Sequence, residues 1–250
     1  MEESDWSSDV CSSDLVTAAH WQALASRRIL FGHQSVGRNI LDGVGALAAQ
    51  AGVSLPVADS RGPDLGPGIT HFAVGRNGDP LGKVRDFAAA VDSAATADIA
   101  LFKLCYIDLS DDGDPRQAAA AYADTLDALR KRHRQTAFVA MTVPLTTVQG
   151  GPKALVKRML GRVPDGYVEN ARRQLFNETL RARFSRDGRL FDLAAIEAAA
   201  RPIHHDGQVI PCLDPALTHD GGHLNDAGAR LVASSFLVFL ADLDLAPGDR

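Results

Sequence analysis

The chain is poor in cysteine: its 250 residues include three, Cys11, Cys105 and Cys212. Cys11 lies in an N-terminal stretch that does not resemble native protein, and the other two are far apart in sequence, so no disulfide framework is indicated. Long hydrophobic runs are also lacking. None reaches the roughly 18 consecutive apolar residues that a membrane-spanning helix needs, which argues against a membrane span.

An excess of positive charge is lacking as well. The 26 basic and 31 acidic residues are interspersed and give a formal net charge of −5. Such a chain offers no broad cationic surface to a phosphate backbone, so we expect no nucleic-acid partner. Apolar residues make up 46% and charged residues 23% of the chain, as in ordinary soluble domains, and a small neutral or weakly charged ligand fits this balance.

The stretch from Asp5 to Leu15 resembles a translated sequencing-library adapter. We therefore interpret residues 1–15 as a non-native segment and residues 16–250 as one domain, because a domain of roughly 100 to 250 residues forms a single core. On this interpretation the natural start of the chain is missing or replaced. The localisation is then undetermined, and an exported or periplasmic origin with a lost signal peptide stays open.

From residue 27 onward, short apolar runs alternate with longer segments of helical period. This alternation predicts an α/β fold, namely a three-layer α/β/α sandwich around a central five-stranded parallel sheet. Segments 56–68 and 202–222 are expected to be surface loops, and segment 146–169 a lid or substrate-facing loop. The expected strands are 27–31, 70–75, 98–106, 136–145 and 189–193, and the expected helices include positions 40–48, 81–95, 116–133, 170–185 and 227–243.

Ser35 stands where such folds place their ligands, beyond the carboxyl end of a strand. It follows the first expected strand, precedes a helix and is flanked by Gly32 and Gly37. The glycines allow a tight turn that exposes the hydroxyl, and the N–H groups at the start of the helix would face an oxyanion. Ser35 is therefore a candidate nucleophile, and a buried turn serine with a structural role is the alternative.

Asp220 and His223 stand three residues apart, just before the last expected helix. This spacing lets the carboxylate reach the imidazole, hold it in one tautomer and stabilise the imidazolium that forms when the ring takes a serine proton. The alternative is a loop aspartate that caps the turn beside an ordinary histidine. Asn225 or Asp226 is expected to be the N-cap of the helix.

Together these motifs resemble the SGNH/GDSL hydrolases over about residues 27–243. The serine follows the first strand in FGHQSVG, Asp and His precede the last helix in DGGH, and the strings RNGDP, KLCYID and TVPLT indicate a less-studied branch. The resemblance implies a flavodoxin-like sheet and acyl transfer through Ser35, His223 and Asp220, with no cofactor. It also implies a short-chain acyl ester as substrate, such as an O-acetyl group on a carbohydrate.

Two departures from the family pattern concern the oxyanion hole. The usual Gly-Asp-Ser is replaced by HQS at 33–35, and the usual GxND falls on CYID at 105–108, which removes the asparagine donor. Acyl transfer needs donors about 3 Å from the developing oxyanion. We predict that these donors are the Asn77 side chain, the backbone N–H of Ser35 and the backbone N–H of Gly75 or Gly78.

His33 and Asp108 are candidate substrate-binding residues. His33, two residues before Ser35, binds substrate or supports the turn from within the loop. Asp108, at the tip of the third strand, orients a substrate hydroxyl or packs against loop amides. No metal site is expected, because the loose cluster of His204, His205, Asp206 and His219 lacks the spacing of a zinc motif.

Two further features have ordinary explanations. Cys105 is expected to be a packed core thiol, since an apolar strand lacks the electropositive, exposed setting of a reactive cysteine. A small basic patch in segment 146–169 either meets an anionic substrate or is a solvated helix face; it consists of Lys153, Lys157, Arg158 and Arg162.

The sequence thus favours a serine esterase and leaves two alternatives open. The same triad supports an O-acyltransferase when the pocket admits a second alcohol. A binding module that grips a glycan or another small ligand without turnover is the other alternative, because fold does not imply function and the usual oxyanion asparagine is absent.

Overall fold

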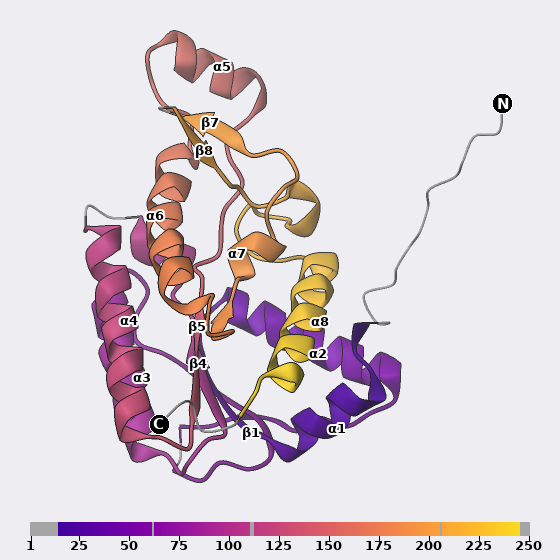
Figure 1. Ribbon diagram of the computed structural model, residues 1–250. Coiled ribbons are helices and arrows are strands. Elements are labelled where there is room, and N and C mark those ends of the chain that lie inside the picture. The colour runs from indigo at the N-terminus through magenta and orange to yellow at the C-terminus, as the bar shows by residue number, and fades with distance from the viewer. Residues whose placement is uncertain (1–14, 62, 111–112, 206, 246–250) are drawn as a thin grey trace, which may run out of the picture.

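The computed structural model describes residues 15–61, 63–110, 113–205 and 207–245 (Figure 1). The suspected non-native segment, apart from Leu15, lies outside these residues, as does Cys11. The helices are α1 (Ala18–Ser26), α2 (Val36–Ala51), α3 (Pro80–Ser93), α4 (Pro115–Arg132), α5 (Gly151–Met159), α6 (Tyr167–Phe184), α7 (Leu193–Ile196) and α8 (Asp226–Asp242), with 3-10 turns η2 (Tyr106–Leu109) and η3 (Pro215–Leu217). The strands are β1 (Arg28–His33), β2 (Val57–Asp59), β3 (Gly68–Ala73), β4 (Ile99–Phe102), β5 (Ala137–Met141), β6 (Leu190–Phe191), β7 (Ile203–His205) and β8 (Gln208–Ile210).

The central sheet is parallel, with strand order β2-β3-β1-β4-β5-β6. The expected α/β sandwich is confirmed, but the expected number of five strands is wrong, because β2 adds a sixth at the edge. This strand has three exposed residues and lies within segment 56–68, where the Pro/Gly-rich composition indicates a loop. Without β2, the order β3-β1-β4-β5-β6 is the flavodoxin-like order.

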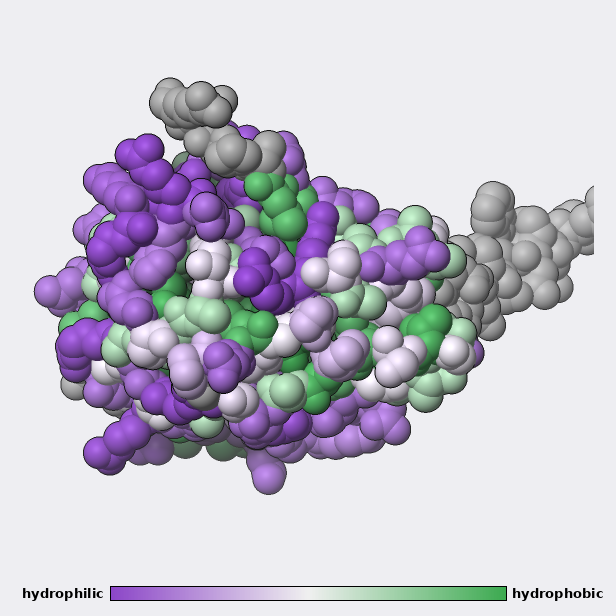
Figure 2. All heavy atoms as spheres, turned by 90° about the horizontal axis from the view of Figure 1, so that it is seen from below, coloured by the Kyte–Doolittle hydropathy of each residue, from purple (hydrophilic) through white to green (hydrophobic). Residues whose placement is uncertain are grey.

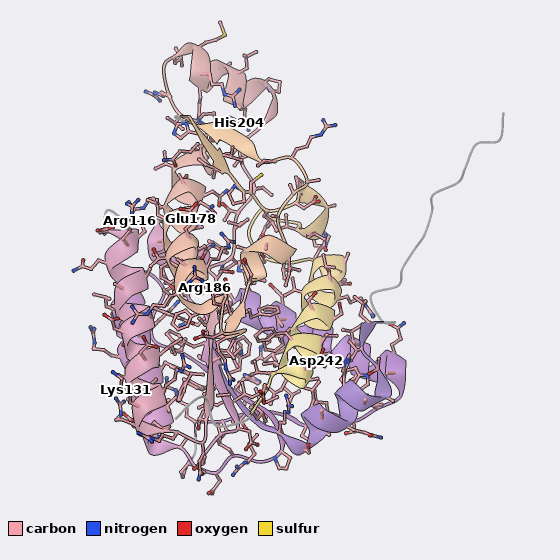
Figure 3. All side chains as sticks on the ribbon, in the orientation of Figure 1. Arg116, Lys131, Glu178, Arg186, His204 and Asp242 are labelled. Carbon is pink, nitrogen blue, oxygen red and sulfur yellow. The ribbon has the colours of Figure 1, made fainter. Side chains whose placement is uncertain are left out.

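Two apolar cores lie on the two faces of the sheet. Helices α1, α2 and α8 cover one face, and α3, α4 and α6 cover the other (Figure 1). Strand β4 is buried along its whole length, as expected for a parallel strand covered on both sides. Of the labelled side chains, Arg116 and Lys131 on α4 and Glu178 on α6 lie on outer helix surfaces (Figure 3).

The ends of several elements follow from capping residues. Asp114 caps α4 by accepting a hydrogen bond from the Arg116 N–H, and Pro115 occupies the first turn. Asn225 caps α8 by accepting from the Gly228 N–H at 2.9 Å, which decides between the two predicted caps. These caps fix where the loops at the carboxyl edge of the sheet end.

Two segments expected as loops contain regular structure. Segment 146–169 contains α5, which projects from one end of the molecule, and segment 202–222 contains the antiparallel β7–β8 hairpin at the same end (Figure 1). The opposite end, seen in Figure 2, mixes hydrophilic and hydrophobic residues. Among the described residues, we find no helix with the length and hydropathy to cross a membrane.

Candidate active site

Ser35 sits in the turn between β1 and α2 with a strained backbone. Its φ of 36° and ψ of −98° make it the one non-glycine residue with positive φ in the described ranges. Such a conformation costs about 1–3 kcal/mol and is found mainly at functional sites. Ser35 is the N-cap of α2 but makes no side-chain capping bond, so its hydroxyl is not used to start the helix.

The flanking glycines have a different role from the one expected. Neither Gly32 nor Gly37 has positive φ, so the strain of the turn falls on Ser35. A Cβ on Gly32 would lie 3.1 Å from both Phe102 and Phe87, and a Cβ on Gly37 would lie 2.4 Å from the Cβ of His33. The two glycines therefore permit close packing around the turn and do not relieve its backbone.

Asp220 and His223 form a hydrogen-bonded pair in the loop before α8. Asp220 Oδ2 lies 2.6 Å from His223 Nδ1, while Oδ1 accepts from the N–H groups of Gly222 at 2.9 Å and His223 at 2.8 Å. The hydrogen bond from the His223 side chain, helped by these amides, holds the pKa of Asp220 well below its usual range. The carboxylate thus fixes the imidazole with Nε2 directed away from it.

Ser35 and His223 each contact one of two residues that are adjacent in sequence, Cys105 and Tyr106. The Ser35 Oγ lies 3.8 Å from Cys105 Sγ, and the His223 Nε2 lies 3.5 Å from the Tyr106 hydroxyl. No hydrogen bond joins Ser35 directly to His223 within the described part of the chain. A second tie between their loops is the Leu224 N–H, which donates to Asn39 Oδ1 at 3.2 Å.

Sequence reasoning missed these roles of Cys105 and Tyr106. Cys105 is buried, as expected, yet its thiol contacts the candidate nucleophile. The Tyr106 ring meets the His223 ring edge-on at 5.7 Å. Burial, together with the nearby Asp220 carboxylate, raises the pKa of Tyr106, so its hydroxyl keeps its proton and can donate.

The loop after β3 is fastened to the turn that holds Ser35. Gln34 Nε2 donates to the carbonyls of Val74 at 2.8 Å and Gly75 at 2.7 Å. Asn77 follows in this loop, and its Oδ1 accepts from Lys83 Nζ at 2.7 Å, which leaves its amide NH2 available. The Ser35 N–H likewise donates to no group in the described ranges.

Two of the predicted oxyanion donors are occupied by carboxylates. The Gly75 N–H donates to Asp86 at 2.6 Å, and the Gly78 N–H donates to Asp108 at 2.8 Å. An amide that already donates to a buried or half-buried carboxylate is not available to an oxyanion. These contacts weigh against Gly75 and Gly78 as oxyanion donors, and their role stays a prediction.

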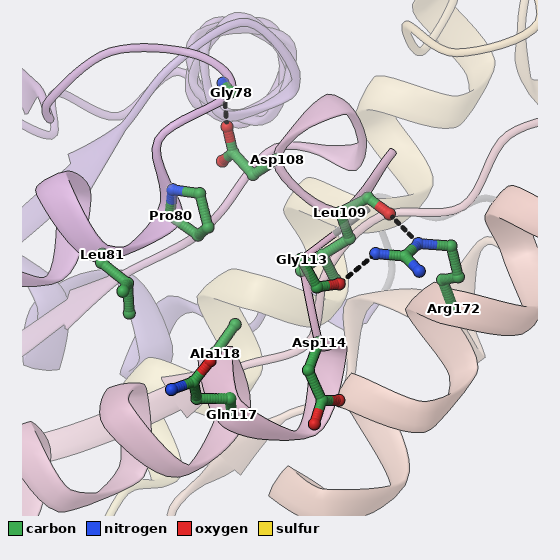
Figure 4. Close-up of a pocket in the computed structure, with 10 residues that line it drawn as sticks. All are labelled: Gly78, Pro80, Leu81, Asp108, Leu109, Gly113, Asp114, Gln117, Ala118 and Arg172. Atoms are coloured by element: carbon green, nitrogen blue, oxygen red, sulfur yellow. Dashed lines mark hydrogen bonds between the residues drawn. The ribbon is translucent and has the colours of Figure 1, made fainter. Parts of the chain in front are cut away.

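Asp108 ties the loops after β3 and β4 to helix α3. Its carboxylate accepts from the Gly78 N–H, from the Cys105 N–H at 2.6 Å and from Lys83 Nζ at 2.7 Å, and the side chains of Lys83 and Asp108 are both fully buried. Figure 4 shows Asp108 with Gly78 at the wall of a small pocket, which neither Ser35 nor His223 lines. These contacts favour the packing role over the substrate role, which stays a prediction.

His33 is buried behind the turn. Its Nε2 lies 3.2 Å from His71 Nδ1, and its ring packs against Phe31 at 4.8 Å between centroids. Burial, reinforced by the neighbouring His71, lowers the pKa of His33 to about 3, so the ring is neutral. This setting matches support of the turn, and a direct substrate contact of His33 stays a prediction.

Two further titratable side chains, Lys103 and Glu197, are buried. Lys103 is fully buried, and its Nζ lies 3.6 Å from Cys105 Sγ. Glu197 is also buried and accepts from the Leu145 N–H. Burial raises the pKa of Glu197 to about 8, although the Leu145 N–H and the Lys103 charge act in the opposite direction.

Glu197 makes stability depend on pH. Between its ordinary pKa of about 4.5 and its folded value of about 8, the folded protein holds a proton that the unfolded chain has released. The contribution of Glu197 to the free energy of unfolding is therefore fully present below its ordinary pKa and is lost as the pH rises through its folded pKa. We expect Tm to fall more steeply between neutral and mildly alkaline pH in the wild type than in Glu197→Gln.

The matched control is Glu178→Gln, which alters an exposed carboxylate on α6. This variant is expected to keep the wild-type slope of Tm against pH. Equal slopes for the wild type and Glu197→Gln would show that Glu197 has no raised pKa.

The described residues contain no group of ligands of the kind that binds metal ions in proteins. No group of three or more His, Cys, Asp or Glu side chains among them could hold a metal ion. Of the loose histidine cluster, Asp206 lies outside the described residues, while His204 lies on β7 near α5, far from Ser35 in sequence and at the projecting end (Figure 3).

No family model and no curated protein sequence matches the chain. Solved structures do resemble it at low identity. They include an acetyl xylan esterase (14% identity, TM-score 0.48, covering 83% of this chain and 96% of that one) and a lipolytic G-D-S-L family protein from Veillonella parvula (14%, 0.47, 86% and 98%). A third is the OSK domain of Drosophila Oskar (12%, 0.42, 93% and 98%). At such identities no residue role is transferred, and the chemistry rests on the geometry of this chain.

Proposed function

We propose that the chain is a serine esterase of the SGNH type in which Ser35 is the nucleophile, His223 the general base and Asp220 its orienting carboxylate. The observation that carries this proposal is the Asp220–His223 pair at 2.6 Å, set at the same edge of the sheet as the strained Ser35 turn. A strained serine between a strand and a helix is the arrangement that exposes a nucleophile in other hydrolases.

The reaction proceeds in two acyl-transfer steps. Ser35 Oγ turns from Cys105 toward His223 Nε2, gives up its proton and attacks the ester carbonyl carbon. The imidazolium, stabilised by Asp220, then protonates the leaving alcohol. Water, deprotonated by His223, attacks the acyl-enzyme; the bond from the acyl carbon to Ser35 Oγ then breaks, His223 returns its proton to Ser35 Oγ, and the acid leaves. Hydrogen bonds of this kind are often long before substrate binds, so the separation of Ser35 from His223 is compatible with this sequence.

The oxyanion hole consists of the Ser35 N–H and the Asn77 side-chain amide. Both donors are unoccupied by other described groups, and Gln34 fastens the two loops that carry them. We expect Asn77→Ala to lower kcat about 10²-fold with little change in KM, because an oxyanion donor acts mainly in the transition state.

Asn77→Asp separates this role from packing. The carboxylate still accepts from Lys83, which now bonds Asn77 Oδ1 at 2.7 Å, but it has no N–H to donate. We expect Asn77→Asp to keep the Tm of the wild type and to lose kcat as Asn77→Ala does. Steady-state kinetics with full turnover in either variant would remove Asn77 from the oxyanion hole.

The proposed substrate is a short-chain acyl ester, such as an O-acetyl group on a carbohydrate. The half-exposed His223 and Asp220 are compatible with a substrate whose alcohol part stays largely in solvent. The same two steps describe an O-acyltransferase when a sugar hydroxyl replaces water in the second step. Product analysis in the presence of a carbohydrate acceptor distinguishes the two reactions.

The direct test is hydrolysis of p-nitrophenyl acetate together with labelling by an organophosphonate. We expect saturable turnover and one label per chain, located on Ser35 by mass spectrometry. Neither turnover nor labelling in a folded protein would overturn the proposal and favour a binding module on the same fold.

A further inference from the structure

Helix α5 turns its apolar face to solvent, whereas a packed helix turns it to the core. Its large apolar side chains point to solvent: the exposed fractions are 60% for Leu155, 54% for Val156 and 79% for Met159, and Leu160 just beyond the helix is 68% exposed. The one buried residue of the helix is Ala154. A helix of a soluble domain normally buries such a stripe against its core.

The geometry of the helix explains this exposure. At about 100° per residue, the apolar positions 155, 156, 159 and 160 centre roughly 170° from Ala154. The helix therefore rests on the body through a small residue and turns its apolar face outward. An exposed, contiguous apolar face of this kind marks a binding surface.

The residues around this apolar face are mainly basic, which favours a partner with negative charge. Residues 150–165 contain four basic side chains against the single acid Asp165, in a chain whose net charge is −5. Lys157 pairs with Asp165 at 2.6 Å, and Arg158 lies over the Tyr167 ring at 5.5 Å. Lys153 and Arg162 make no ion pair within the described residues.

We propose that α5 and the following turn to Val163 dock on a lipid surface with anionic headgroups. The apolar side chains enter the boundary between headgroups and acyl chains, and the flanking cations meet the headgroup charges, as in other interfacial helices. A second copy of the chain fits less well, because two such faces in contact would bring like charges together.

The β7–β8 hairpin lies at the same projecting end of the molecule as α5 (Figure 1), and Val209 of β8 is 55% exposed. The chain that leads into α5 is tied to the candidate site, since the Thr147 N–H donates to the Gly221 carbonyl at 2.8 Å. Docking would therefore hold the loop of Asp220 and His223 close to the bilayer.

The docking does not depend on the proposed esterase activity and is tested by binding alone. The full chain is sedimented with vesicles of phosphatidylcholine, and with vesicles of an equal mixture of phosphatidylcholine and phosphatidylglycerol. We expect binding to the mixed vesicles, reduced by salt, and much weaker binding to phosphatidylcholine.

Two double variants examine the two parts of the surface. Leu155→Ser with Met159→Ser should lower the partition coefficient roughly tenfold or more, because each side chain loses its apolar burial in the bilayer. Lys153→Glu with Arg162→Glu should abolish the preference for the mixed vesicles.

Matched controls are Val57→Ser, at a residue 40% exposed on the edge strand β2, and Arg116→Glu, at an exposed residue on α4. Both controls should bind as the wild type does, and thermal unfolding checks that all variants fold. Failure of the wild type to bind mixed vesicles, equal binding by the Leu155/Met159 variant, or a dimer that this variant dissociates would overturn the proposal.

Discussion

The Ser35→Ala variant is expected to lose ester hydrolysis by roughly 10³-fold or more in kcat, since the reaction then lacks its nucleophile and only the oxyanion donors and substrate binding remain. Because Ser35 makes no capping bond and its hydroxyl has one hydrogen-bond partner among the described residues, Cys105, the fold should persist. Steady-state kinetics and circular dichroism of the same preparation measure the two effects.

Ser35→Gly provides a sharper comparison. Glycine adopts a φ of 36° without the steric cost that serine meets, so this variant should be as inactive as Ser35→Ala but thermally more stable than the wild type. Substantial hydrolysis by either variant would mean that another group attacks the ester. An unchanged or lower Tm in Ser35→Gly would show that the turn stores no strain.

The second large effect concerns the buried Lys83–Asp108 pair. We expect Lys83→Met to destabilise the protein by about 3–5 kcal/mol, because it leaves the Asp108 carboxylate buried without its counter-charge. The two side chains are 2.7 Å apart and completely buried, so loss of either partner leaves the other charge buried and unpaired. Urea unfolding monitored by fluorescence gives the free energy of unfolding.

An exposed ion pair in the same protein serves as control. Lys157 and Asp165 are 2.6 Å apart but partly or largely solvent-exposed, so Lys157→Met should cost less than about 1 kcal/mol. Adding Asp108→Asn to Lys83→Met should recover part of the lost stability, as an amide needs no counter-charge. A loss below that of the exposed pair would mean that water reaches Asp108 in the folded protein.

The central sheet was predictable because burial on both faces makes strands such as β1 and β4 nearly continuous apolar runs. The edge strand β2 escaped prediction, since three exposed residues in a Pro/Gly-rich segment have no such signature. The β7–β8 hairpin escaped it for the same reason, with polar and histidine residues in place of an alternating pattern.

The candidate site was predictable where its residues are close in sequence. The three-residue spacing of Asp220 and His223 predicted that the carboxylate reaches the ring, and the structure places them 2.6 Å apart. Contacts between distant segments were not predictable: nothing local indicates that Gly75 and Gly78 donate to Asp86 and Asp108.

One signal in the sequence was overlooked. Lys103 interrupts the apolar run of the third expected strand, and a charged residue inside a central strand needs a specific partner. Because Lys103 stands two residues before Cys105, it indicated that the protein interior is polar at the carboxyl end of this strand. The buried contact of Lys103 with Cys105, next to Ser35, is the result.

The packing of α8 against α2 has a consequence for synthesis on the ribosome. Ser35 emerges early, whereas the hydrogen bond that ties the loop of His223 to α2, from Leu224 to Asn39, joins positions 185 residues apart. The apolar stripe of α2 stays uncovered until the last helix has left the exit tunnel. A chain that terminates early therefore lacks His223, the proposed base of Ser35, and leaves this face of α2 open to chaperones and proteases.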